Sequence, residues 1–179
     1  MRRDADILAP QLNAEQRAVF NAVSTSVESN TGGTFMIDAP AGSGKTFTMT
    51  AISAGLRAKG KLVLCSDSTG LAALLLPGGL TAHSTFKIPF GDYLALDLTP
   101  RDLRRCDRPF GGETALFAGD WRQVGPVVTF GTLADVVESS VISSHLWKNV
   151  KWFRLVHSMR DRLDLPYSRT VRAVGEGLL

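Results

Sequence analysis

A glycine-rich turn between a short apolar run and a helical pattern is the feature that most constrains the fold of this chain. The apolar run covers residues 34–37, and apolar residues recur at helical spacing after the turn. This order of strand, glycine-rich loop and helix is typical of a phosphate-binding loop, and it argues against a chance glycine-rich turn. The loop consists of Ala39, Pro40, Ala41, Gly42, Ser43, Gly44, Lys45 and Thr46.

Each part of this loop suits a bound triphosphate. Gly42 and Gly44 have no Cβ, so their backbone N–H groups can close around phosphate oxygens. The helix that follows directs its positive end at the same anion. Lys45 supplies a positive charge for the β- and γ-phosphates, and the hydroxyl of Thr46 can bind Mg²⁺. The sequence therefore predicts that residues 39–46 bind ATP and Mg²⁺.

Composition limits the class of protein further. The chain has 179 residues, of which 44% are hydrophobic and 21% charged, as expected for one globular domain with a substantial core. A net charge of +3 permits an anionic partner without requiring one. Cys65 and Cys106 lack the spacing of a metal or redox site and are expected to be reduced thiols. We find no membrane-spanning run and no signal peptide, so we expect an intracellular protein that has no membrane partner.

The first part of the chain alternates helical and extended patterns. Residues 1–11 are polar and are expected to be disordered. A helix is predicted to begin after Asn13, a good N-cap, and Gln16 fits the capping box three residues later. A second helix should follow the loop, over residues 45–59. Residues 61–65 are almost all apolar, as in a buried parallel strand.

Further strands are predicted at residues 114–118 and 150–155, with a short helix at residues 132–138 between them. Ser144 is a candidate cap for a turn that carries Leu146. Strands that alternate with helices through short loops form right-handed βαβ units. The sequence therefore predicts an α/β fold in which helices flank a parallel sheet.

Two segments rich in hydroxyl groups and glycine, residues 66–73 and 77–86, follow the strand predicted at residues 61–65. Both are expected on the ligand-binding rim of an open sheet. Small donors there can hold the backbone of a single nucleic-acid strand, and Phe86 can stack on a base. An ordinary loop and turn is the alternative, and composition alone favours it.

Taken in order, these segments resemble the Pif1 family of DNA helicases, in a form similar to the helicase of Helitron-type transposons. The resemblance implies the RecA-like fold of the P-loop NTPases. Ala39 stands where the loop pattern usually begins with glycine, and alanine is common there in helicase-type loops. The matching segments are residues 12–16, 39–46, 68–73, 76–79, 81–89, 109–112, 119–127 and 155–160.

The resemblance implies a role for individual residues of the nucleotide site. Gln16, which the spacing alone would assign only to the helix cap, would recognise adenine. Lys45 and Thr46 would hold the triphosphate and Mg²⁺. Gln123 would sense the γ-phosphate and couple it to DNA, and Arg160 would be an arginine finger. Without the resemblance, Gln123 and Arg160 would be taken for a surface amide and a surface cation.

The resemblance also implies that the partner is single-stranded DNA or a DNA junction. The residues that would contact it are small, hydroxyl-bearing or aromatic. A histidine in a loop is as readily explained by local hydrogen bonds as by DNA, so both explanations of His83 stay open. The candidate DNA-binding residues are Thr69, Gly70, His83, Ser84 and Phe86.

One departure from the family pattern concerns catalysis. The family has a strand ending in Asp-Glu before the segment that matches residues 109–112; the Asp supports Mg²⁺ and the Glu activates the attacking water. This chain contains no Asp-Glu dipeptide. The interval from Phe90 to Pro109 is too short for a strand with both its connections, because a parallel crossover takes about a dozen residues. The sequence reads as if a block were missing near residues 91–93. Pro100 would interrupt or start a helix in this interval.

Other departures are smaller. Gly125 replaces an apolar residue before Pro126, and Ser158 replaces the asparagine usual two residues before Arg160. The family's second RecA-like domain has no counterpart in the chain. We therefore divide the chain into a disordered N-terminus at residues 1–11, a partial RecA-like ATPase domain at residues 12–160 and a tail at residues 161–179.

Two functions remain open from the sequence. The first is an ATP-dependent DNA helicase of the Pif1 type, of which this chain is a fragment; the resemblance would place it in DNA repair, recombination or telomere maintenance, with the nucleus as a candidate compartment. The second is a catalytically silent remnant that binds nucleotide weakly. A small P-loop kinase is disfavoured by residues 119–123. The oligomeric state stays open.

Overall fold

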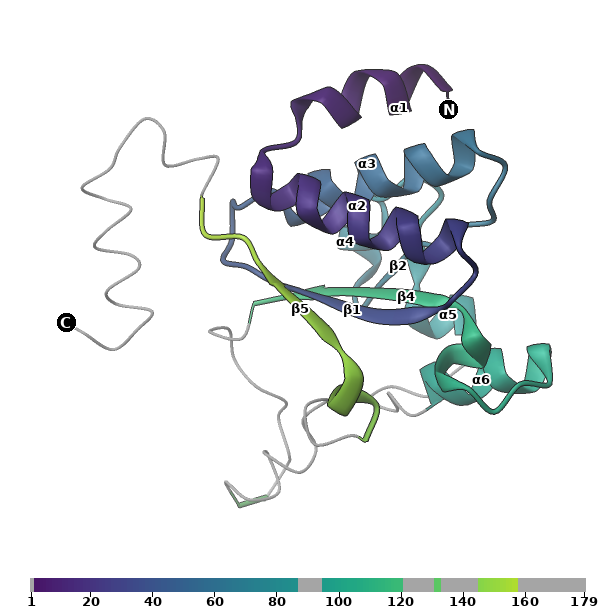
Figure 1. Ribbon diagram of the computed structural model, residues 1–179. Helices are drawn as coiled ribbons and strands as arrows, with labels where there is room; N and C mark the ends of the chain where they lie inside the picture. Colours follow the sequence, from purple (N-terminus) through teal and green to yellow (C-terminus); the bar gives the residue numbers. More distant parts are fainter. Residues whose placement is uncertain (1, 87–94, 121–130, 133–144, 158–179) are drawn as a thin grey trace.

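The structure, a computed structural model, describes residues 2–86, 95–120, 131–132 and 145–157. It is a mixed α/β structure with one parallel three-stranded sheet and a separate two-stranded one (Figure 1). The α-helices are α1 (Arg2–Leu8), α2 (Ala14–Glu28), α3 (Lys45–Ala58), α4 (Gly70–Ala73), α5 (Ala82–Phe86) and α6 (Ala95–Arg104), the 3-10 helices are η1 (Ala9–Gln11), η2 (Pro109–Gly112) and η4 (His145–Asn149), and the strands are β1 (Gly33–Asp38), β2 (Ser66–Asp67), β3 (Leu80–Thr81), β4 (Thr114–Gly119) and β5 (Lys151–Arg154).

The three-stranded sheet has the order β4-β1-β5, and all its pairs are parallel. Asp38, the last residue of β1, is the register partner of Gly119 in β4 and of Arg154 in β5. The carboxyl ends of the three strands therefore meet at one edge of the sheet, and the phosphate loop begins there. These strands confirm three of the four strands predicted for this sheet.

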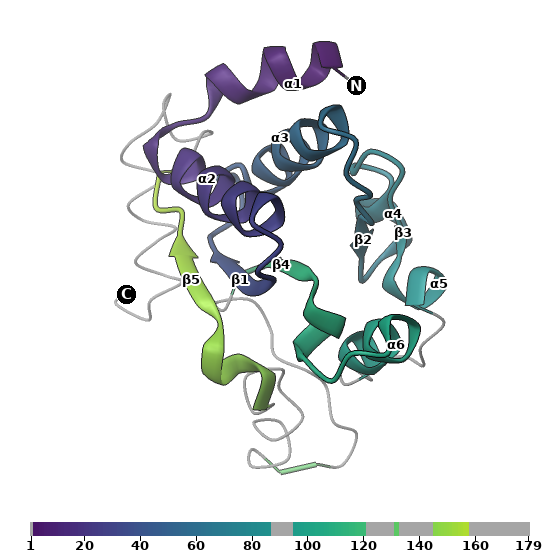
Figure 2. The same cartoon turned by 45° about the vertical axis from the view of Figure 1, so that its right-hand side comes forward.

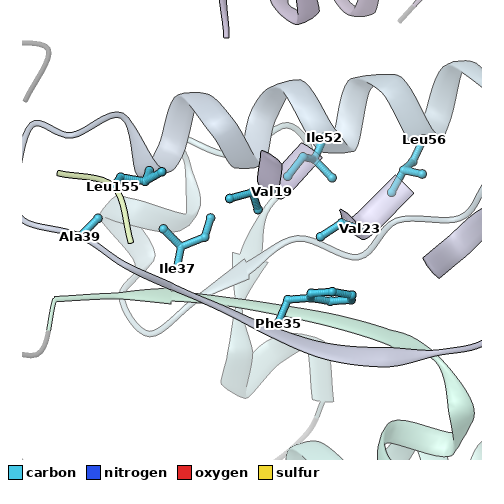
Figure 3. Packing of buried hydrophobic residues seen from close by; sticks show 8 residues of the cluster. All are labelled: Val19, Val23, Phe35, Ile37, Ala39, Ile52, Leu56 and Leu155. Carbon is cyan, nitrogen blue, oxygen red and sulfur yellow. The ribbon is translucent and has the colours of Figure 1, made fainter. Parts of the chain in front are cut away.

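Helices α2 and α3 cover one face of the sheet, as Figure 1 shows. The apolar stripes of both helices and the inward side chains of β1 form the core between these two layers (Figure 3). Burying one such side chain contributes about 1.5 to 3 kcal/mol. The core residues are Val19, Val23, Phe35, Ile37, Ala39, Ile52, Leu56 and Leu155.

The ends of the two core helices follow rules that are readable in the sequence. Asn13 and Gln16 form the predicted capping box at the start of α2: each side chain accepts the other residue's backbone N–H. At the end of α3, Gly60 has a φ of +76°, and the N–H groups of Gly60 and Lys61 donate to Arg57 O and Leu56 O. This is the Schellman arrangement, in which glycine takes the left-handed position.

The expectation that residues 1–11 are disordered is wrong. Residues 2–8 form helix α1, which packs against α3. Ala5 and Leu8, three residues apart and therefore on one helical face, are partly buried. These two apolar side chains are too few to form an obvious apolar stripe in the sequence. The helix can form because α3 provides a surface against which they are partly buried.

The strand predicted at residues 61–65 is also wrong. This segment has no strand pairing, and only Ser66 and Asp67 pair, with Leu80 and Thr81 of β3. Figure 2 shows the β2-β3 pair, with α4 and α5, beside the three-stranded sheet instead of within it. Within the described residues β4 pairs only with β1. An apolar segment forms a strand only where a neighbour satisfies its backbone groups, and no described strand lies between β4 and this segment.

Helix α6 corrects the expectation for Pro100, which lies within the helix and neither starts nor ends it. The predicted helix at residues 132–138 and its neighbour Ser144 lie outside the described residues, apart from Thr132. Leu146 lies in η4, where the sequence predicted a turn. None of the helices in the described ranges combines the length and the apolar character needed to cross a bilayer.

Candidate nucleotide-binding site

The phosphate loop connects the carboxyl end of β1 to the amino end of α3. Gly42 and Gly44 have φ values of +82° and +85°, a conformation that glycine adopts without steric cost. Gly44 is the N-cap residue of α3, a helix of 14 residues, so the unpaired N–H groups of its first turn lie at the loop. The positive end of α3 is therefore placed where the sequence predicts phosphate.

Ala39, which replaces the usual glycine of the loop pattern, is compatible with this geometry. Its φ is outside the left-handed region, and its N–H donates to Gly119 O at 3.0 Å. Its methyl group is buried in the core together with Ile37 and Leu155 (Figure 3). Because neither φ nor space demands glycine here, alanine strains nothing and adds to the core.

Lys45 lies over its own loop. Its ammonium donates to Ala39 O at 2.5 Å and to Pro40 O at 3.0 Å. Burial lowers the pKa of Lys45, and the negative charges of Asp120 and Asp38 oppose that shift in part. The ammonium thus bonds to neutral carbonyl oxygens, which a more strongly attracting phosphate oxygen can replace.

Two carboxylates flank this ammonium at the same edge of the sheet. Asp38 ends β1 and forms an ion pair with Arg154, whose Nε lies 3.3 Å from its carboxylate oxygen. Asp120 directly follows β4 and interacts electrostatically with Lys45. From the sequence, Asp120 was a candidate only for a carboxylate that could replace the missing acidic strand, and Asp38 was not a candidate, although it ends the apolar strand before the phosphate loop.

Gln16 joins the start of α2 to the phosphate loop. Its Oε1 accepts from Asn13 N at 3.1 Å, and its Nε2 donates to Ser43 O at 3.3 Å. The side chain has no exposed surface. One donor and one acceptor position of the amide remain, the pair that would read an adenine edge. In this conformation an adenine reaches the amide only if the surrounding chain moves.

Ser43 is fully buried, and its hydroxyl donates to Pro40 O at 2.8 Å. Its side chain therefore holds the loop in shape. Thr46, in the first turn of α3, is exposed, so its hydroxyl is accessible for the predicted Mg²⁺. Mg²⁺ is usually held by one or two carboxylates, phosphates and water. Thr46 and Asp120 supply suitable oxygen donors, although the described residues contain no cluster of three or more His, Cys, Asp or Glu.

Gln123 and Arg160 lie outside the described residues, so their predicted roles stay predictions.

The structure brings the candidate DNA-binding residues together. Thr69 caps α4 by accepting the N–H of Ala72 at 3.3 Å, and Gly70 is the first residue of that helix. The other three candidates, His83, Ser84 and Phe86, lie on α5. Helices α4 and α5 follow β2 and β3, which are parallel neighbours, so all five residues lie at one end of the two-stranded sheet.

A buried carboxylate that the site assignment did not include braces the strained turn before β4. Asp97 of α6 accepts the N–H of Phe110 at 2.6 Å and pairs with Arg101 at 2.6 Å. Phe110 has a φ of +52°, and Gly111 approaches Pro100 O so closely that a Cβ there would clash. The spacing of Asp97 and Arg101, four residues apart, could have predicted their ion pair from the sequence.

The parallel sheet, the glycine-rich loop after β1 and Lys45 define a P-loop nucleotide-binding domain. The sequence model of the PIF1-like helicase family matches residues 11–93 and 91–172. The chain belongs to this family. A comparison with curated proteins gave no significant match.

The fold is similar to those of solved Pif1 helicases. A Pif1 helicase from Candida albicans has a TM-score of 0.73 and 24% identity, over 92% of this chain and 44% of that one. A Bacteroides Pif1 in complex with ADP-AlF3 and ssDNA has a TM-score of 0.75 and 20% identity, over 94% and 47%. A Pif1 structure described as the basis for DNA unwinding at forked dsDNA by two coordinating Pif1 helicases has a TM-score of 0.74 and 20% identity, over 94% and 49%. The chain thus spans less than half the length of these relatives and has their RecA-like fold in part.

Proposed function

We propose that this chain is part of the first motor domain of an ATP-dependent DNA helicase of the Pif1 type. One observation carries the proposal, the geometry of the phosphate loop within a Pif1-family fold. Gly42 and Gly44 are in the left-handed conformation, the ammonium of Lys45 bonds to loop carbonyls, and Gln16 donates to Ser43 O in the loop. The Bacteroides relative was solved with ADP-AlF3 and ssDNA, which supports both nucleotide and DNA as ligands here.

In the proposed mechanism the N–H groups of the loop and of the first turn of α3 bind the phosphates. Lys45 exchanges its two carbonyl partners for oxygens of the β- and γ-phosphates. Thr46 and Asp120 would hold Mg²⁺, which when bound neutralises charge on the β- and γ-phosphates. Gln123 would sense the γ-phosphate, and Arg160 would stabilise the charge that develops on it.

The DNA strand would lie across the ends of β2 and β3, at Thr69, Gly70, His83, Ser84 and Phe86. The relative described as unwinding DNA at forked dsDNA supports a junction as a further partner. Roles in repair, recombination or telomere maintenance, and a nuclear location, are proposed on the family resemblance alone. An intracellular location is proposed from the sequence.

A specific observation favours the second function, a catalytically silent P-loop remnant. The two matches to the family model overlap at residues 91–93, where the sequence reads as if a block were missing. The missing acidic strand would supply the carboxylate that activates water, and general-base assistance of this kind contributes about 10²- to 10⁴-fold in rate. We therefore propose that this chain binds ATP weakly and hydrolyses it slowly.

DNA-stimulated phosphate release from the 179-residue chain, with Lys45→Ala as the blank, tests the two functions. We expect wild type to bind a labelled ATP analogue, Lys45→Ala not to bind it, and phosphate release to stay near the blank. Rapid DNA-dependent release that Lys45→Ala abolishes would show a working motor in which another carboxylate replaces the acidic strand. Equal nucleotide affinity of wild type and Lys45→Ala would overturn the site assignment.

A further inference from the structure

A three-bond contact joins the start of α2 to the chain that leaves β5. The carboxylate of Glu15 accepts the N–H of Val156 at 2.9 Å and the N–H of His157 at 3.5 Å, and it lies 2.9 Å from Nδ1 of the His157 ring. These residues are far apart in the sequence. We refer to this contact between Glu15 and residues 156–157 as the Glu15 clasp.

The carboxylate of Glu15 is held in its charged form. Burial alone would raise the pKa of Glu15, but the hydrogen bonds from Val156 N, from the His157 ring and from His157 N lower the pKa below its usual value. The side chain of Glu15 is 26% exposed, whereas that of His157 is 79% exposed. The partly buried carboxylate of Glu15 thus holds the more exposed residues 156–157 in place.

The clasp lies next to the residue proposed to read the base. Gln16, the next residue of α2, bonds to Ser43 O in the phosphate loop. On the other side, Leu155 is fully buried, and its N–H donates to Asp38 O at 3.1 Å. Figure 3 shows Leu155 near Ala39, the first residue of the phosphate loop. The clasp therefore fixes residues 156–157 at the end of the site where Gln16 lies.

Accordingly, we propose that Glu15 is a positioning residue for the base-binding side of the nucleotide site. It holds residues 156–157 as a wall beside Gln16, so that it affects the affinity for the base without affecting the affinity for the phosphates. This inference rests on the proposed function, because it requires a nucleotide at the phosphate loop. It is distinct from a simple favourable charge at a helix N-terminus, which would stabilise α2 and leave ligand preference unchanged.

The test compares ATP with inorganic tripolyphosphate, which has the phosphates but no base. In Glu15→Gln, which removes the charge, we expect ATP to bind about fivefold more weakly and tripolyphosphate to bind as in wild type, because charge-assisted hydrogen bonds are roughly twice as strong as neutral ones. Glu28→Gln is the matched control: Glu28 ends the same helix and pairs with Lys59, away from the clasp. It should change neither affinity.

A second variant keeps the test decisive if Glu15→Gln folds poorly. His157→Phe removes the ring nitrogen but leaves both backbone N–H donors, so we expect about a twofold loss of ATP affinity alone. The inference is overturned if a folded variant, Glu15→Gln or His157→Phe, has the same ratio of ATP affinity to tripolyphosphate affinity as wild type. Binding of neither ligand by wild type above the Lys45→Ala blank would overturn the proposed function itself, and the inference with it.

Discussion

At the residue scale, Lys45 couples nucleotide binding to proton binding. Burial lowers the pKa of Lys45 from the ordinary lysine value of 10.5, and a phosphate bound beside it would raise that pKa again. When the lysine of the free protein is neutral, binding must therefore take up a proton. Affinity is fully present while Lys45 is protonated and is lost as the pH rises through its lowered pKa.

We expect the affinity for ATP to be level near neutral pH and to decline at a pH below 10.5, earlier than an unperturbed lysine would allow. Titration of a fluorescent ATP analogue from about pH 7 to about pH 10 measures this. Lys45→Arg is the control, because arginine keeps its charge throughout this range. The same alkaline decline in Lys45→Arg would assign it to another group.

Asp97 is the second residue with a large expected effect. It is 1% exposed, forms an ion pair with Arg101 and accepts the N–H of Phe110, whose φ is positive. We expect Asp97→Ala to lower the free energy of unfolding by about 3 kcal/mol, because it leaves the half-buried guanidinium of Arg101 and the N–H of Phe110 without their partner. Urea unfolding measures this. Asp102→Ala, an exposed change on the same helix, should stay within about 0.5 kcal/mol, and equal losses in both variants would refute the brace.

At the scale of elements, the segment at residues 61–65 shows one face to the core and the other to solvent. Val63 packs against the core, whereas Leu62 is 90% exposed and Leu64 is 65% exposed. This alternation is that of a strand, but the segment forms no strand ladder: its one bond to a described strand residue is from Leu80 N to Cys65 O at 3.2 Å. The segment therefore has the side-chain pattern of a strand without the backbone pairing of one.

Neighbouring substitutions test this arrangement. Leu62→Ser and Leu64→Ser should each change the free energy of unfolding by less than about 0.5 kcal/mol, because little apolar surface is lost from the interior. Val63→Ala should cost about 1 kcal/mol, because it removes packed methyl groups. Chemical denaturation compares the three variants. A loss above about 2 kcal/mol in Leu62→Ser would show that this residue is buried in solution.

At the scale of the whole molecule, exposed leucines gather on the part that is separate from the three-stranded sheet. Monomeric proteins rarely expose many large apolar side chains close together, so we infer that these leucines have a partner. The acidic strand that we propose is missing near residues 91–93 is a candidate, because among the described strands β4 pairs only with β1. The exposed leucines of this part are Leu62, Leu64, Leu71, Leu74, Leu75 and Leu80.

We expect the chain to become more stable when the family's acidic segment is inserted after Phe90. Each leucine that becomes buried would contribute about 1.5 to 3 kcal/mol. The urea midpoint should rise, and binding of a hydrophobic dye should fall. An insert of the same length made of glycine and serine should do neither. If both inserts behave alike, the exposed surface has another cause.

The sequence by itself determined the local features of this protein. The phosphate loop, the capping box of Asn13 and Gln16 and three strands of the sheet depend on residue types at short spacing, where backbone sterics and periodicity decide the outcome. The family followed from the order of such segments.

Only the tertiary structure decided the rest. It placed Glu15 against residues 156–157, Asp97 against Phe110 and Asp120 near Lys45, because such contacts join distant segments and depend on how the elements pack. It also decided that residues 2–8 form helix α1 and that residues 61–65 form no strand. A sequence pattern shows that a segment can form a helix or strand, but whether it does depends on a neighbour to bury its apolar face or bond its backbone.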